Sequence, residues 1–208
     1  MKSIHKVIFD NSTNLKSIDD ESIDLVVTSP PYPMIEMWDE IFAKQNEEIK
    51  QALNDNDGNR AFELMHKVLD SVWEESFRVL KKGGFACINI GDATRTIDSH
   101  FRLYSNHSRI ASKCFSLGFS SLPAIIWRKQ TNAPNKFMGS GMLPAGAYVT
   151  LEHEYILVLR KGNKRQFKKA EDKLLRNQSA FFWEERNNYT IGNFLYCKNI
   201  LQSFKFQF

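Results

Sequence analysis

The sequence has no run of about 18 apolar residues, and its first residues, Met1–His5, carry no apolar signal-peptide stretch. It has only three cysteines, Cys87, Cys114 and Cys197, which are scattered singly. This pattern predicts reduced, mostly buried thiols, and it excludes a disulfide framework or a zinc-type cluster. We therefore expect a cytoplasmic protein with no membrane partner.

Metal ligands are equally scarce. His153 stands between Glu152 and Glu154, but no second histidine or cysteine lies at ligand spacing. We expect His153 to be a structural histidine and the protein to hold no metal.

The composition is that of an ordinary globular chain. Its 208 residues are 42% hydrophobic and 25% charged, enough for one sizeable core. The net charge of +4 does not by itself indicate a nucleic-acid partner, but residues 160–208 hold eleven Lys/Arg against four Asp/Glu. The pairs Arg160-Lys161, Lys164-Arg165 and Lys168-Lys169 form a basic stripe suited to phosphates. A solvated helix face explains the stripe equally well when it is taken alone.

Apolar runs alternate with amphipathic segments along most of the chain. We expect strands over 6–9, 22–28, 85–90 and 122–127, a last strand pair over 149–159, and helices over 38–53, 61–80 and 104–117. The sequence Lys81-Lys82-Gly83-Gly84 predicts the cap of the second helix, and Gly118 that of the third. The fold class is therefore α/β with a largely parallel sheet.

The most informative segment is Ser29-Pro30-Pro31-Tyr32, directly after the predicted strand over 22–28. Two consecutive prolines fix φ near about −65° and remove two N–H donors, so the chain leaves the sheet as a stiff loop. Its carbonyls face the cleft beyond the strand's carboxyl end, where open α/β sheets bind ligands. Rigid acceptors beside an aromatic ring suit a planar ligand with an exocyclic amino group, such as a nucleobase.

Together with Thr28, this segment resembles motif IV of the S-adenosylmethionine-dependent DNA amino-methyltransferases. The serine form is typical of the cytosine-N4 enzymes, whereas the adenine-N6 enzymes more often carry aspartate. The stretches 33–39 and 136–148 are similar to a subgroup associated with the palindrome CTAG, and the likeness covers residues 1 to about 190.

This resemblance implies a Rossmann-like methyltransferase sheet and a site-specific enzyme of a restriction-modification system. The enzyme would transfer a methyl group from S-adenosyl-L-methionine to the N4 amine of cytosine in duplex DNA. Ser29 and a main-chain carbonyl would bind the amine of a flipped cytosine, and Tyr32 would stack on its ring. The implied catalytic residues are Ser29, Pro30, Pro31 and Tyr32, and the implied cofactor-binding residues are Asp10, Asn11 and Thr28. The implied DNA-binding residues are Lys129, Lys136, Arg160, Lys161, Lys164 and Arg165.

Three further features have alternative interpretations. Cys87 lies mid-strand in an apolar run, so we expect it to be core and not the nucleophile of a cytosine-C5 enzyme. Asp92 either contacts the base or cofactor or caps a helix or turn. The Gly139-Ser140-Gly141 segment lacks a preceding apolar strand, so we interpret it as a loop near DNA and not as a cofactor turn.

The resembled family also carries a glycine-rich Asp-Pro-Phe-x-Gly-x-Gly segment, which this chain does not contain. We therefore expect an incomplete sheet, with a catalytic core over 1–160 and the start of a basic target-recognition region over 161–208. A second polypeptide would supply the cofactor-binding half. Without it, these residues would bind the cofactor weakly and duplex DNA loosely. The alternatives are an inactive or partner-dependent fragment that only binds DNA, and an adenine-N6 methyltransferase.

Overall fold

The computed structural model describes residues 4–129 and 151–178, which fall into two units. The first unit comprises Met1–Ala124 with Leu157–Arg165, and the second comprises Ile125–Ile156 with Gln166–Phe208. The first contains β1 (Ile23–Thr28), a 3-10 turn (Glu36–Trp38), α1 (Asp39–Gln45), α2 (Glu47–Asn54), α3 (Gly58–Val79), β2 (Leu80–Ile90), β3 (Ala93–Ile97), β4 (His100–Tyr104), α4 (Asn106–Leu117) and β5 (Phe119–Ser121). The second contains β6 (Ile125–Arg128) and α5 (Ala170–Gln178), and β7 (His153–Lys161) belongs to both.

The main sheet has the strand order β1-β2-β7-β5, with β6 paired to the first half of β7. Strand β1 runs parallel to β2, with Thr28 opposite Ile88, whereas β5 and β6 both run antiparallel to β7. The α/β class is confirmed, but the predicted largely parallel sheet is wrong. Strands β2, β3 and β4 follow one another without a helix between them, and no helix lies between β5 and β6, so the chain makes no parallel crossover at either place.

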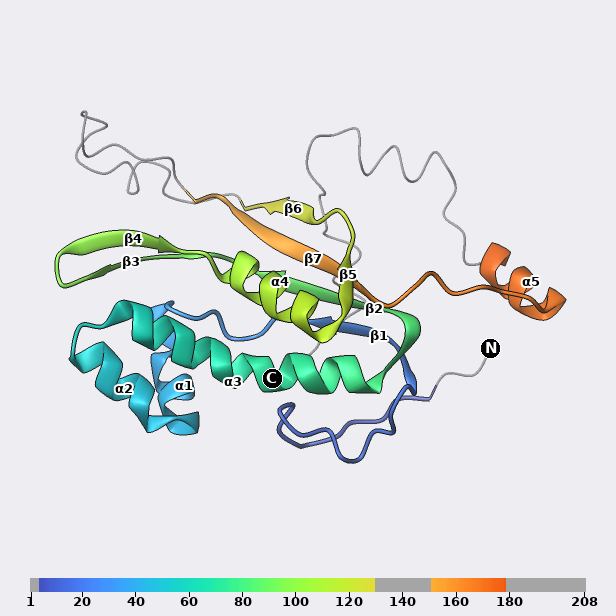
Figure 1. The fold of residues 1–208 in the computed structure, drawn as a ribbon, viewed down its shortest axis with the longest axis horizontal. Helices are drawn as coiled ribbons and strands as arrows, with labels where there is room; N and C mark the ends of the chain where they lie inside the picture. Colours follow the sequence, from blue (N-terminus) through green and yellow to red (C-terminus); the bar gives the residue numbers. More distant parts are fainter. Residues whose placement is uncertain (1–3, 130–150, 179–208) are drawn as a thin grey trace. The chain divides into compact units, whose positions relative to one another are not determined.

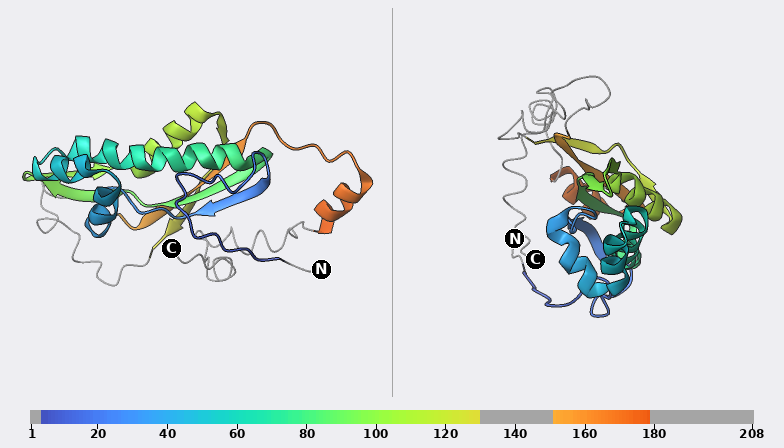
Figure 2. Two further views of the ribbon diagram at one scale, coloured as in Figure 1. Left: turned by 90° about the horizontal axis from the view of Figure 1, so that it is seen from below. Right: turned by 90° about the vertical axis from the view of Figure 1, so that its left-hand side faces the viewer.

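Helix α3 carries the core of the first unit. Its buried face includes Leu64, Met65, Leu69 and Trp73, at the three- and four-residue spacing that predicts this helix from the sequence. Asp57 caps its start by accepting a hydrogen bond from the backbone N–H of Arg60 at 3.0 Å. Helix α3 (teal in Figure 1) runs along β2, with α4 beside it and α1 and α2 near its first turns (Figures 1 and 2).

The predicted glycine cap after this helix is wrong. The chain turns straight into β2 at Leu80, and Lys81–Gly84 form an irregularity in that strand. The register moves from Ile23 opposite Leu80 to Leu25 opposite Phe85. Gly83 has a φ of +76°, and a side chain at Gly84 would come within 2.9 Å of the Lys81 carbonyl oxygen. Gly83 and Gly84 therefore form part of a bulge in β2 and do not end helix α3.

Other boundaries differ from the predictions in smaller ways. Residues 6–9 are exposed and form no strand. The predicted helix over 38–53 is divided at Asn46, whose side chain accepts from the Glu48 N–H at 3.0 Å and caps α2. Helix α4 and its left-handed cap at Gly118 are confirmed. The strand predicted over 122–127 lies at β6, and the pair predicted over 149–159 is the single strand β7.

The β3–β4 hairpin is absent from the predictions, and it follows β2 after only two residues. Arg95 of β3 makes a two-pronged ion pair with Asp39 of α1, with N–O distances of 2.9 and 2.7 Å. This pair braces the hairpin against the helix that follows the proline segment. Within the described residues, no helix combines the length and apolarity that a membrane span requires.

Candidate active site

The segment Ser29–Tyr32 forms a loop at the carboxyl end of β1, as predicted. Pro30 is buried, while Ser29, Pro31 and Tyr32 are half-buried. The loop closes in a turn in which the Tyr32 carbonyl accepts from the Ile35 N–H at 3.2 Å. Met34, 1% exposed, has a φ of +67° in this turn, and its N–H lies 3.4 Å from the Met65 sulfur. The loop is thus anchored on the buried face of α3.

Three uncharged polar side chains meet beyond the end of β1. Asn89 of β2 donates its amide N–H to the Tyr32 hydroxyl at 2.8 Å and lies 3.5 Å from Ser29 Oγ. Ser29 Oγ and the Tyr32 hydroxyl are 3.4 Å apart. The register explains the meeting, because Thr28 pairs with Ile88 and the next residue of each strand follows at the same edge. We call Ser29, Tyr32 and Asn89 the hydroxyl–amide cluster.

Asn89 is a member of this cluster that the sequence analysis did not select as a candidate. Its signal was available, since it is the polar residue between Ile88 and Ile90 near the end of an apolar strand. An amide presents both a donor and an acceptor, so this position can bind a neutral polar ligand without a formal charge.

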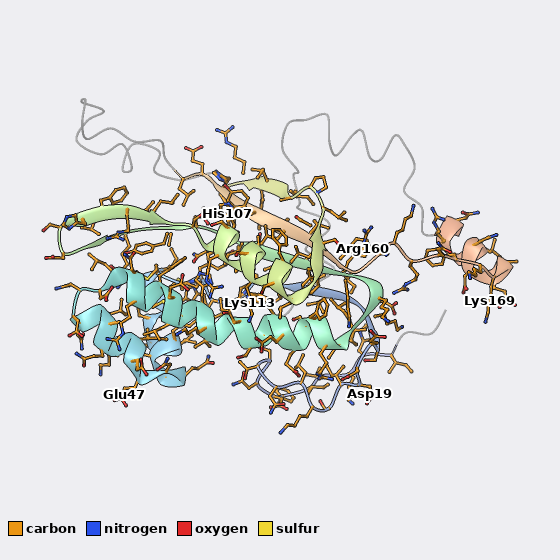
Figure 3. All side chains as sticks on the ribbon, viewed as in Figure 1. Asp19, Glu47, His107, Lys113, Arg160 and Lys169 are labelled. Carbon is orange, nitrogen blue, oxygen red and sulfur yellow. The ribbon has the colours of Figure 1, made fainter. Side chains whose placement is uncertain are left out.

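Asp92 lies just after β2 and is 6% exposed. Its carboxylate accepts from the backbone N–H of His107 at 3.0 Å and lies 2.8 Å from Nδ1 of the same residue. His107 is in the first turn of α4 (Figure 3). Of the two predicted roles for Asp92, these contacts are those of a helix cap. Its carboxylate also neutralises the positive end of the helix dipole there.

The three predicted cofactor residues are not brought together. Thr28 ends β1 beside the hydroxyl–amide cluster. Asp10 and Asn11 are exposed and do not follow a strand. The segment after them bonds to the last turns of α3: Leu15 N–H donates to Glu75 at 2.7 Å, and Arg78 donates to the Leu15 and Ile18 carbonyls. That region adjoins the start of β1, at the opposite end from Thr28.

Two of the predicted DNA-contacting cations of the first unit, Lys161 and Arg165, lie near the start of β1. Lys161 is buried, donates to the Arg78 carbonyl at 3.4 Å and lies 4.7 Å from the centre of the Phe77 ring. Arg165 pairs with Asp24 at 2.7 Å, whereas Lys164 is exposed. Arg160 donates to the Gly162 carbonyl at 3.0 Å. Lys161 and Arg165 therefore have structural partners, and Lys164 presents its charge to solvent.

A cavity of about 750 Å³ lies among these cations. Its lining includes Glu21, Phe77, Lys82, Lys161 and Lys164. The end of α3 adjoins it, and Lys161 binds a carbonyl of that helix end, so part of the local positive charge already offsets the helix dipole.

In the second unit, Lys129 pairs with Glu154 at 2.9 Å and lies 3.8 Å from the centre of the Trp127 ring. Lys136 and the Gly139–Gly141 segment lie outside the described residues. DNA contact by the six predicted cations stays a prediction.

The remaining candidates are consistent with structural roles. Burial raises the pKa of the half-buried Cys87 thiol, which disfavours the thiolate that a nucleophile requires. His153 lies 3.1 Å from the Tyr155 hydroxyl. Across residues 4–129 and 151–178, no group of three or more His, Cys, Asp or Glu side chains is arranged to hold a metal ion.

Comparison with known proteins shows the family of the chain that carries this loop. The family model described as DNA methylase, N6_N4_Mtase, matches residues 23–202. The chain belongs to this family. Over 190 residues it is 55% identical to the type II methyltransferase M.MthZI of Methanothermobacter thermautotrophicus, covering 91% of this chain and 54% of that protein. It is 50% identical to the type II methyltransferase M.MjaI of Methanocaldococcus jannaschii, covering 89% and 64%.

Solved structures agree with the family. The chain matches TTHA0409 of Thermus thermophilus with a TM-score of 0.65 and 27% identity, over 89% of this chain and 65% of that one. The structure of TTHA0409 complexed with S-adenosyl-L-methionine matches with a TM-score of 0.59 and 29% identity, over 83% and 60%. The chain thus spans between about half and two thirds of the length of these relatives.

Proposed function

We propose that this chain carries the base-binding part of a site-specific DNA methyltransferase of the restriction-modification type. The reaction is methyl transfer from S-adenosyl-L-methionine to the N4 amine of cytosine in duplex DNA. Support comes from the family match, from relatives named type II methyltransferases and from a similar protein solved with this cofactor. The observation that carries the proposal is Ser29 Oγ at the carboxyl end of β1, 3.4 Å from the Tyr32 hydroxyl.

The hydroxyl–amide cluster suits an uncharged base. The exocyclic amine of cytosine is a weak nucleophile because its lone pair is delocalised into the ring. Ser29 Oγ and a main-chain carbonyl at Ser29-Pro30 accept its two hydrogen bonds and draw the nitrogen towards sp³ geometry. The Tyr32 ring stacks on the flipped base, and Asn89 holds the Tyr32 hydroxyl from β2. Catalysis then comes from positioning and oriented dipoles, without a strong base or a covalent enzyme intermediate.

The cofactor supplies a sulfonium methyl group when bound. Among the predicted contacts, Thr28 fits this role because it borders the cluster. Asp10 and Asn11 do not fit, since the segment that follows them bonds near the start of β1. The rest of the cofactor pocket therefore requires residues beyond these three.

A second segment or polypeptide that pairs with β1 would meet that requirement. Among the described strands, β1 pairs with β2 alone, so its other edge has free backbone donors and acceptors.

Duplex DNA is the proposed substrate, with CTAG as the proposed site and Lys129, Lys136, Arg160, Lys161, Lys164 and Arg165 as proposed contacts. The exposed Lys164 is the strongest of the described candidates.

The test is product identification. The protein, together with the segment or polypeptide that completes its cofactor pocket, is incubated with S-adenosyl-L-methionine labelled in its methyl group and with duplexes that contain or lack CTAG. The nucleosides are then separated and identified by mass. We expect labelled N4-methylcytosine from the CTAG duplex. Ser29→Ala should abolish most of the label, and Ser121→Ala, at an exposed position in β5, should not. Labelled N6-methyladenine would contradict the cytosine assignment, and DNA binding without any methyl transfer would favour the binding-only alternative.

A further inference from the structure

A buried amide joins the two loops that frame the site. Asn106 is the first residue of α4 and is 0% exposed. Its side-chain nitrogen donates to the Pro33 carbonyl and to the Gly91 carbonyl, each at 3.0 Å. Pro33 directly follows the Ser29–Tyr32 loop, and Gly91 directly follows β2. One side chain therefore ties the loop after β1 to the end of the neighbouring strand.

The proline loop has few backbone donors of its own. Residues 30, 31 and 33 are prolines and have no N–H to donate, so the backbone of this segment is held by hydrogen bonds that its carbonyls accept, beside the side-chain contacts described above. A donor that reaches the Pro33 carbonyl from another element is therefore a main restraint on this segment.

Asn106 is in turn oriented by a buried histidine. His66 of α3 is 0% exposed, and its Nε2 lies 3.0 Å from Asn106 Oδ1. Because an amide oxygen only accepts, Nε2 must carry the proton. Nδ1 has no hydrogen-bond partner among the described residues, and the Phe62 ring packs edge-on at 4.5 Å between centroids. Burial lowers the pKa of His66 to about 3, which keeps the ring neutral at physiological pH.

This amide is not needed to cap its own helix. Asp92 already accepts from the His107 N–H in the first turn of α4. Both hydrogen atoms of the Asn106 amide point to carbonyls of other segments, and both carbonyls lie at the edge that bears Ser29.

We propose that Asn106 is a positioning residue that holds the Ser29–Tyr32 loop against the end of β2, and that His66 fixes the orientation of its amide. The role in methyl transfer rests on the proposed function, whereas the restraint on the loop does not. Loss of the amide frees the Pro33 carbonyl and loosens the loop that presents Ser29 Oγ and the stacking ring.

The test uses Asn106→Ala together with a matched pair at His66. His66→Gln places an amide N–H near the position of Nε2, whereas His66→Leu removes the donor. Ser108→Ala, an exposed change in the same turn of α4, is the control. For each variant, kcat, KM for DNA, the melting temperature and the exchange rates of the Ile35 and Trp38 amides are measured. Both amides donate within the turn that follows the loop.

We expect Asn106→Ala and His66→Leu to lower kcat by about 10–100-fold with a smaller change in KM, as misplacement of reacting groups does. The Ile35 and Trp38 amides should exchange faster while amides of α3 keep their protection. His66→Gln should recover most of kcat and of the protection, and Ser108→Ala should match the parent protein.

Unchanged exchange at Ile35 and Trp38 in folded Asn106→Ala protein would overturn the inference, whatever the activity. So would a uniform rise in exchange across α3, which would mark a purely global loss of stability. If the parent protein transfers no methyl group even with the segment or polypeptide that completes its cofactor pocket, the proposed function fails, but the exchange measurements still decide the inference. A parent-like kcat in Asn106→Ala, with Ser29→Ala inactive, would overturn the inference and leave the proposed function in place.

Discussion

The two ends of β1 are built from different chemistry. At its carboxyl end, Ser29, Tyr32, Asn89 and Asn106 form contacts between uncharged hydroxyls, amides and carbonyls. At its amino end the contacts are ion pairs. Asp24 binds Lys81 at 2.8 Å and Arg165 at 2.7 Å, and Lys161 lies 3.4 Å from Glu21. The loop that follows β1 therefore makes uncharged contacts, whereas the start of β1 is bordered by ion pairs.

This chemical difference indicates that the two ends of β1 have different roles. A neutral nucleobase is recognised by hydrogen bonds and stacking, and a nearby formal charge would be costly to desolvate when the base binds. Half-exposed ion pairs contribute little energy each, but several of them fix how the bulge in β2 and the end of β7 meet. We infer that the carboxyl end is specialised for binding and the amino end for holding the sheet together.

The sharpest way to break this comparison is to remove a polar group at the neutral end. Ser29→Ala should lower the methyl-transfer rate by about ten- to a hundredfold, since one oriented hydrogen bond at such a site contributes about 1.5–3 kcal/mol. Tyr32→Ala should cost a similar amount through lost stacking of about 1–3 kcal/mol. Single-turnover kinetics with CTAG duplexes measures both.

Cys87→Ser is the control for these variants, because Cys87 lies on β2 near the cluster but has no assigned chemistry. It should retain methyl transfer despite some loss of stability. Complete inactivity of folded Cys87→Ser protein would mean that the mechanism is wrongly assigned.

The groups at the two ends of β1 should lose their stabilising effect over different ranges of pH. The pKa of His66 is lowered to about 3 in the folded protein, chiefly by burial, so the unfolded chain takes up a proton first as the pH falls below about 6.5. The stability of the fold with neutral His66 is fully present above about pH 6.5, and it is lost as the pH falls towards the folded pKa of His66. Between pH 7 and pH 5 the loss should reach about 2 kcal/mol. At the charged end, Lys81 lowers the pKa of Asp24 and Arg78 lowers that of Glu75, so its losses come at lower pH, where carboxylates titrate.

Urea unfolding at several pH values measures this difference. His66→Gln should flatten the stability profile between pH 7 and pH 5. An unaltered slope in His66→Gln protein would show that His66 is not the group that senses acid in this range.

The parts of the fold that the sequence predicted are those set by local pattern. The α3 periodicity and the Gly118 cap of α4 are visible in short windows of sequence, and so is the stiff exit from β1 at Pro30-Pro31. The β3–β4 hairpin was not predicted. Residues 93–97 alternate in burial in the structure, but no glycine turn signal marks the hairpin in the sequence. Its turn uses Asp98 and Ser99 at φ values of +48° and +61°, and neither is the glycine that usually marks such a turn.

The site shows the same division. Ser29 and Tyr32 were selected as candidates because prolines mark their segment. Asn106 belongs to a different element, 73 residues from Pro33 in sequence, and only the packing of α4 brings its amide to that carbonyl. The strand expected before Asp10 and Asn11 does not form, so cofactor contact by these two residues stays a prediction.

A smaller effect should follow from loss of the Asn89 amide. Asn89→Ala removes the 2.8 Å bond to the Tyr32 hydroxyl, and a neutral hydrogen bond contributes about 0.5–1.5 kcal/mol. We expect the methyl-transfer rate to fall by about two- to tenfold, less than for Ser29→Ala. A double-mutant cycle with Tyr32→Phe tests the contact, because the two changes should be less than additive if Asn89 acts through that hydroxyl. Full additivity would show that Asn89 acts on the substrate by another route.

The smallest effect should come from the charged end. Asp24→Asn removes the partner of both Lys81 and Arg165, but the Asp24 side chain is 56% exposed, so we expect a loss of less than about 1 kcal/mol in unfolding free energy. Salt should screen this difference, and the gap between parent and variant should nearly vanish at about 1 M, where the Debye length is about 3 Å. Asp19→Asn, at an exposed residue near α3 (Figure 3), is the control and should show no gap at either salt concentration. Urea midpoints at low and high salt provide the measurement. A loss above about 2 kcal/mol that persists in salt would show that the amino end holds its charges in a protected environment, and the contrast between the two ends of β1 would then fail.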